Sequence, residues 1–176
     1  MLLGNTWKPL LWVLFVATVL GANWSISQFG IVPIGFGTSA PAGVYFAGIA
    51  FTLRDLLHNQ PGSSRPWIIS AIMAGAFLSA LVADAQRLAL ASATAFFLAE
   101  MADWAVYSPL RRKGWIVAVA ASNSIGLLVD SIIFLSLAFG SLAFLEGQIL
   151  GKAYMTLLAI AILWIIRAGG KAKTSC

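Results

Sequence analysis

Charged residues make up only 10% of this 176-residue chain, and it has a single histidine and a single cysteine. His58 and Cys176 cannot supply the ligand set of a zinc site. A Ser-His-Asp triad would need His58, which we expect at a cytoplasmic helix end away from the other buried polar groups. In the tail, Ile165 and Ala172 stand where a P-loop has its first glycine and its Ser or Thr. The sequence therefore predicts no enzyme, no cofactor and no ATP hydrolysis by this chain.

Apolar residues, in contrast, make up 60% of the sequence, which is far above the content of soluble domains. A hydrocarbon core of about 30 Å requires roughly 20 helical residues per crossing. Six stretches meet this requirement, at residues 10–29, 41–58, 67–84, 88–108, 115–139 and 143–166. They fill almost the whole chain. We therefore predict one transmembrane domain over residues 1–176, an all-α integral membrane protein built as a six-transmembrane-helix bundle.

The basic residues outside these stretches lie mostly on one side of the predicted membrane. Eight lie in the N-terminal arm, the second and fourth connections and the C-terminal tail, whereas the other side has Arg87 alone. Because Lys and Arg concentrate in cytoplasmic loops, both termini are predicted in the cytoplasm of a multi-pass inner-membrane protein. The formal charge of +5 then reflects topology and attraction to anionic lipids, and no nucleic-acid partner is expected.

The first connection, residues 29–41, is the longest and reads FGIVPIGFGTSAP. Its glycines and prolines predict a break between helices. On the outer side it is either a lid over a cavity or an ordinary turn.

Polar side chains inside the predicted spans form two layers, judged by the 1.5 Å rise per helical residue. A charge near the middle of a spanning helix costs roughly 2.5 to 3.5 kcal/mol, so such residues usually serve a site, a pathway or a partner charge. The inner layer consists of Arg54, Glu100, Asp103, Ser122 and Asn123. The outer layer consists of Asn23, Asp130, Gln148 and Lys152.

The inner layer has two interpretations. Arg54 can neutralise Glu100 or Asp103, and such a buried ion pair either locks helices together or exchanges protons during transport. Asp55 is expected at the wetted cytoplasmic boundary, without a special role.

The outer layer is the better candidate for binding a ligand. Asp130 and Lys152 can pair with each other or with a ligand, and Asn23 and Gln148 offer amide donors and acceptors. Asn123, Asp130 and Phe134 are seven and then four residues apart, which predicts one shared helix face. The predicted substrate-binding residues from both layers are Asn23, Glu100, Asp103, Asn123, Asp130, Phe134, Gln148 and Lys152.

A longer pattern joins these residues, from Ala95 and Phe96 through Glu-x-x-Asp at Glu100 and Asp103 to the basic turn after Tyr107. It continues with Ser122, Asn123, Asp130 and Phe134, and with the GQILGKAYM segment that contains Gln148 and Lys152. This pattern resembles the VUT family, the queuosine-precursor transporters.

The resemblance implies uptake of a 7-deazaguanine base, such as 7-cyano-7-deazaguanine or its aminomethyl relative. It also implies a six-helix fold similar to the S components of energy-coupling-factor transporters. Two readings follow: a carrier that works alone, or a substrate-binding S component for a vitamin or other heterocycle, energised by a separate ATPase complex.

Overall fold

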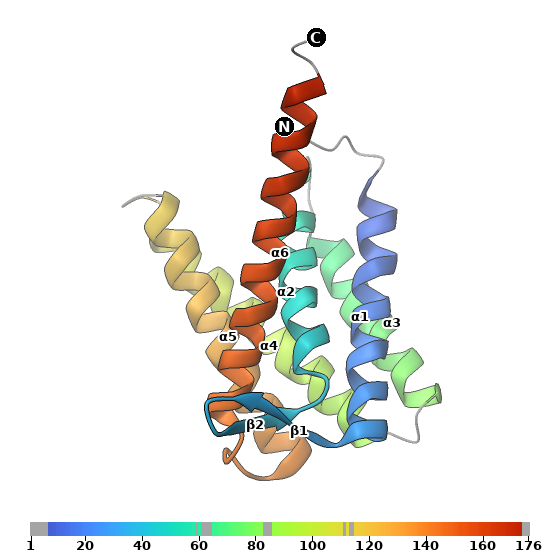
Figure 1. Ribbon diagram of the computed structural model, residues 1–176. Helices are drawn as coiled ribbons and strands as arrows, with labels where there is room; N and C mark the ends of the chain where they lie inside the picture. The colour runs from blue at the N-terminus through green and yellow to red at the C-terminus, as the bar shows by residue number, and fades with distance from the viewer. Residues whose placement is uncertain are drawn as a thin grey trace.

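The computed structural model describes residues 7–58, 60, 65–82, 86–110, 112 and 115–173. Helices dominate it, with a short hairpin after the first helix (Figure 1). The helices and strands follow in the order α1 Lys8–Phe29, β1 Ile31–Gly35, β2 Thr38–Pro41, α2 Val44–His58, α3 Arg65–Val82, α4 Gln86–Leu110, α5 Trp115–Phe139 and α6 Leu145–Lys173. Each helix overlaps one of the six stretches expected from hydropathy.

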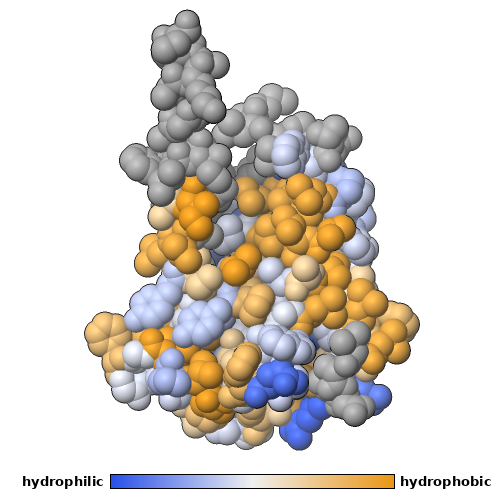
Figure 2. All heavy atoms as spheres, turned by 45° about the vertical axis from the view of Figure 1, so that its right-hand side comes forward, coloured by the Kyte–Doolittle hydropathy of each residue, from blue (hydrophilic) through white to orange (hydrophobic). Residues whose placement is uncertain are grey.

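Three of the described helices, α1, α4 and α5, are long and apolar enough to cross a membrane, and α3 is apolar but shorter. Large apolar side chains also cover the outside of the bundle, among them Phe77, Leu81, Leu90 and Leu157. Figure 2 shows hydrophobic residues over much of one face. Lipid tolerates such a surface, because the helices satisfy their own backbone hydrogen bonds. The chain is therefore a helical multi-pass membrane protein.

The helices pack as a bundle in which neighbours in sequence are mostly neighbours in space. The most extensive contact is between α4 and α5, while α1 packs on α2 and α3, and α2 packs on α6. A cluster of buried apolar side chains joins α1, α2, α3 and α4, with Phe15, Phe51 and Phe96 in contact through their rings. These contacts hold α2 between α1 and α6, so that its polar residues face the interior.

The first connection is an antiparallel hairpin, a regular structure that the sequence analysis did not predict. Ile31 pairs with Pro41 and Val32 with Ala40, and the register shifts near the turn. Phe36 has a positive φ of 50° at the turn, flanked by Gly35 and Gly37, which accept such angles at no steric cost. The hairpin lies at the opposite end of the bundle from the beginning of α1 and the end of α6 (Figure 1).

The hairpin packs against α6 through a glycine. A Cβ at Gly147 would overlap the backbone carbonyl of Ser39 on β2. The neighbouring turn of α6 repeats this close approach, because a Cβ at Gly151 would lie 2.8 Å from a methyl group of Val44 on α2. The hairpin and the start of α2 are therefore fixed on α6 at the same end as the outer polar layer.

Candidate functional site

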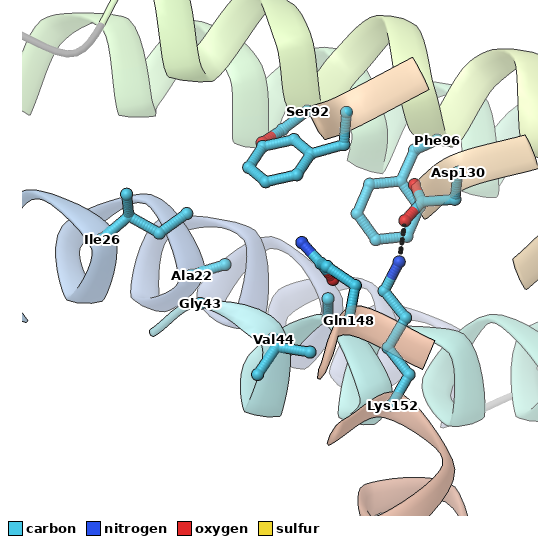
Figure 3. A pocket seen from close by; sticks show the side chains of 11 residues that line it. Ala22, Ile26, Gly43, Val44, Ser92, Phe96, Asp130, Gln148 and Lys152 are labelled. Atoms are coloured by element: carbon cyan, nitrogen blue, oxygen red, sulfur yellow. Dashed lines mark hydrogen bonds and ion pairs between the residues drawn. The ribbon is translucent and has the colours of Figure 1, made fainter. Parts of the chain in front are cut away.

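A small buried cavity lies between the helices at the level of the outer polar layer (Figure 3). Residues from α1, α2, α4, α5 and α6, with Gly43 just before α2, form its wall. The side chains with a polar or aromatic group in this wall are Ser92, Phe96, Asp130, Phe134, Gln148 and Lys152. We call this cavity the outer pocket. Four of the predicted binding residues, Asp130, Phe134, Gln148 and Lys152, line it.

Asp130 of α5 and Lys152 of α6 form an ion pair in the wall of the outer pocket (Figure 3). The side chains are only 5% and 1% exposed. The Lys152 Nζ also donates to the Ser131 Oγ at 2.8 Å. Removing two charges from water is expensive, and the pair together with the hydroxyl offsets that cost. A ligand that enters the pocket meets one anion and one cation side by side.

Two buried amides near the pocket have atoms without a hydrogen-bond partner in the described part of the chain. The Ser92 hydroxyl donates to the Asn23 Oδ1 at 2.9 Å, but the Asn23 Nδ2 has no acceptor. The Gln148 Oε1 has no donor. These residues are 0% and 2% exposed, so bulk water does not reach them and only a small molecule inside the pocket, such as a water or a ligand, can satisfy these atoms. Each such orphan group costs about 1–3 kcal/mol, which a bound polar molecule would recover.

The cavity volume of the outer pocket is about 30 Å³. That is enough for one or two water molecules, since a cavity needs roughly 10–15 Å³ on this measure to hold a water. An aromatic base does not fit without movement of the surrounding side chains or helices.

The inner polar layer forms a separate network around Arg54 of α2. Its guanidinium donates two hydrogen bonds to the Asp55 Oδ1, at 3.1 Å from Nε and 2.8 Å from Nη2. Nη2 also donates to the Asn123 Oδ1 at 2.9 Å. The carboxylates of Glu100 and Asp103 lie farther away, at 3.6 and 3.9 Å. We call these residues, with His58, the inner network.

The structure agrees with one expectation about the inner network and corrects another. Asp55 is 41% exposed, as expected of a residue that can be wetted, and it forms the shortest ion pair with Arg54. His58 does not lie away from the buried polar groups: its Nε2 is 2.7 Å from the Glu100 Oε1. The reason is helical periodicity, because His58 follows Arg54 by four residues and so shares its face of α2.

The structure also divides the residues that were predicted to bind substrate together. Glu100, Asp103 and Asn123 belong to the inner network and are not among the residues that line the outer pocket. Asn23 contacts the pocket through Ser92. A shared face on α5 was expected for Asn123 and Asp130, but they serve different clusters because two helical turns separate them.

An aromatic side chain that sequence reasoning missed connects the two clusters. The Phe51 ring lies 5.0 Å from the Arg54 Cζ and 5.6 Å from the Lys152 Nζ, within the range of cation–π contacts. It packs on Phe96, whose own side chain lines the outer pocket, with ring centroids 5.5 Å apart. The signal for this contact that the sequence contained was the position of Phe51, three residues before Arg54 on α2.

Apolar helices around a pocket with charged and amide groups are typical of membrane proteins that bind small molecules. Comparison with protein families agrees: residues 40–168 match the family described as "Putative vitamin uptake transporter". The chain belongs to this family. No match was found among curated proteins or among solved structures.

Proposed function

We propose that the protein imports a queuosine precursor, such as 7-cyano-7-deazaguanine or 7-aminomethyl-7-deazaguanine, and binds it in the outer pocket. The observation that carries this proposal is the buried Asp130–Lys152 pair beside amide atoms that have no hydrogen-bond partner among the described residues. A guanine-like base presents a ring N–H and an exocyclic amine on one edge, and a carboxylate can accept from both. Lys152 and Gln148 would then address the ring carbonyl or the 7-substituent.

Aromatic rings in the pocket wall support a flat ligand. Phe96 and Phe134 both line the pocket and are 7% exposed. Their faces suit stacking on a planar heterocycle, which is worth about 0.5–1.5 kcal/mol beyond the buried area. Binding would require the pocket to widen, and the Asp130–Lys152 pair would exchange part of its mutual contact for contacts with the base.

We further propose that all six helices cross the inner membrane with both termini in the cytoplasm. Lys8 and Arg65 begin α1 and α3, and Arg112 follows α4, so these basic residues belong to one predicted side. Figure 1 supports this arrangement, since α1 begins and α6 ends at the end of the bundle opposite the hairpin. The outer pocket, nearer the hairpin, would then receive its ligand from outside.

Binding by the purified protein tests the proposal directly. 7-Cyano-7-deazaguanine should raise the unfolding temperature in a concentration-dependent way, because a ligand of the native state stabilises it by mass action. Asp130→Asn removes a charged acceptor, and hydrogen bonds to charged groups contribute about 1.5–3 kcal/mol. The Kd should therefore rise about 10- to 150-fold and uptake into cells should be lost.

Glu146→Gln is the matched control. It also replaces a carboxylate by an amide, but Glu146 is exposed at the start of α6, outside the pocket. It should bind like the unchanged protein. Unaltered binding and uptake by a correctly inserted Asp130→Asn variant would exclude Asp130 as the recognition group. Absence of any deazapurine effect would reject this substrate class.

The family description favours a vitamin as an alternative ligand. As a second candidate we therefore propose a substrate-binding S component for a vitamin or other heterocycle, working with a separate ATPase complex. Screening the same purified protein against B vitamins distinguishes the two ligands. Uptake by the chain alone in proteoliposomes distinguishes a self-sufficient carrier from a subunit, which would bind ligand but not accumulate it without its ATPase.

A further inference from the structure

Among the described residues, the buried part of the inner network has more negative than positive charge. The side chains of Glu100 and Asp103 are only 14% and 9% exposed, and Arg54 is the buried cation beside them. Asp55 and Arg65 lie at more exposed positions, where water screens their charges. From α5 the network receives the uncharged groups of Asn123 and Ser122, the latter hydrogen-bonded to Asp103. Within the described part of the chain, two buried carboxylates therefore share one buried cation, which leaves one negative charge unbalanced at this depth.

A single proton would balance this charge. Asp103 is 6% exposed, and its Oδ1 has no hydrogen-bond partner among the described residues. The same holds for the Glu100 Oε2, although both oxygens lie within 4 Å of the Arg54 guanidinium. An uncompensated charge inside a membrane protein is expensive. A proton on Glu100 or on His58 would remove the net charge without displacing any side chain.

We infer that the inner network is a proton-binding site, exchanged with the cytoplasm through His58, and that its proton is coupled to import. This inference rests on the proposed function, because it assigns an energy source to that transport. The ligand is one proton per transport cycle. In the releasing step the Glu100 carboxyl gives its proton to the His58 Nε2, the imidazolium loses a proton from Nδ1 to water, and the Glu100 carboxylate remains.

One feature gives water access to this site. The His58 side chain is 36% exposed, so its ring reaches solvent while Nε2 contacts Glu100. A groove between α3 and α4 also includes Glu100 in its wall. Its other lining residues are mostly apolar and lie on the outside of the bundle, among them Ile69, Met101 and Trp104, so this groove faces lipid rather than water.

Phe51 provides the physical link between the proton and the substrate. Its ring contacts Arg54 in the inner network and Lys152 in the outer pocket. Protonation of Glu100 would weaken its attraction for Arg54. The guanidinium would then be held by Asp55 and Asn123 alone, and the Phe51 ring, which also packs on Phe96, would follow any change in its position. Such a movement would change the wall of the outer pocket, which is too small for a base in this structure.

The experiment uses the full chain in proteoliposomes, with the membrane potential held at zero by valinomycin and equal potassium. Radiolabelled 7-cyano-7-deazaguanine is the probe. With the outside one pH unit more acidic than the lumen, coupling to one proton allows about tenfold accumulation at equilibrium. His58→Gln and Glu100→Gln should reduce accumulation to onefold while preserving counterflow, the exchange of labelled for unlabelled base without a gradient. Glu146→Gln, at an exposed position, should accumulate the base like the unchanged protein.

The outcomes separate the two proposals. If the unchanged protein shows counterflow but its accumulation ignores the pH gradient, the proton site is rejected and the substrate assignment stands. If it shows neither binding nor counterflow, both are rejected. If Glu100→Gln does not fold, the His58→Gln variant tests the proton site instead, because this substitution replaces a half-exposed ring and buries no new polar group. Normal gradient-driven accumulation by a folded His58→Gln variant would also overturn the inference.

Discussion

The ion pair between Asp130 and Lys152 gives the sharpest stability prediction. Lys152→Met keeps most of the volume of the side chain but leaves the buried Asp130 carboxylate without its cation. It also removes the 2.8 Å hydrogen bond to Ser131. Because both partners are buried, there is almost no solvent screening to discount. Breaking one side of such a pair costs about 3–5 kcal/mol.

For a chain of this size, 1 kcal/mol corresponds to about 2–4 °C in the midpoint of unfolding. Lys152→Met should therefore lower the midpoint of the detergent-solubilised protein by about 6–20 °C. The double variant Lys152→Met with Asp130→Leu removes both charges, and should recover most of the loss, since apolar replacement of a whole buried pair is often neutral or stabilising. The comparison of single and double variants is a double-mutant cycle.

Arg87→Met is the matched control, because Arg87 is an exposed cation that donates one hydrogen bond, at 3.0 Å, to the Leu137 carbonyl. It should cost no more than about 1.5 kcal/mol. The reasoning would be refuted if Lys152→Met were as stable as Arg87→Met, or if the double variant were less stable than either single one. Either result would mean that the two charges are hydrated in the membrane-embedded protein.

Two further substitutions probe the packing of the hairpin and the inner network. Gly147→Ala should lower the midpoint of thermal unfolding and weaken uptake, because the new Cβ overlaps the Ser39 carbonyl. Gly126→Ala is the control: its Cβ would lie 3.5 Å from its nearest neighbours, so the midpoint should hardly change. Arg54→Gln should cost about 3–5 kcal/mol at neutral pH, because it leaves three carboxylates in the inner network without their shared cation. Stability of this variant should rise as the pH of the unfolding assay is lowered, and a pH-independent loss would count against a charge-based role.

The helices were predictable from the sequence because long apolar runs between polar turns leave few alternatives in a membrane. The observed α5, Trp115–Phe139, has the bounds that hydropathy gave for residues 115–139. The hairpin was not predictable in the same way. Its strands have only five and four residues, and Pro33, which lacks a backbone N–H, lies inside the first of them. The signals present were a short apolar run, with the β-branched residues Ile31, Val32 and Ile34, and the Gly-Phe-Gly turn after it.

Depth along each helix placed the polar residues in their two layers, but it did not give their partners. Depth predicted that His58, at the C-terminal end of α2, lies apart from the polar layers, although its side chain reaches Glu100 on another helix. Likewise the spacing of Asn123 and Asp130 predicted a shared face, which does not require a shared cavity. Contacts between helices depend on how far each side chain extends and how the helices cross. Neither the reach of a side chain toward another helix nor the crossing of two helices can be read from the sequence of one helix alone.

The double contact of Phe51 limits how the specificity of this protein can be changed. A substitution that adapts the outer pocket to a new ligand by altering Lys152 also alters the surroundings of the Phe51 ring and, through it, those of Arg54. Ligand preference and energy coupling would therefore tend to change together during evolution. Engineering a new cargo would call for compensating substitutions on α2, even though that helix supplies no charged group to the cargo itself.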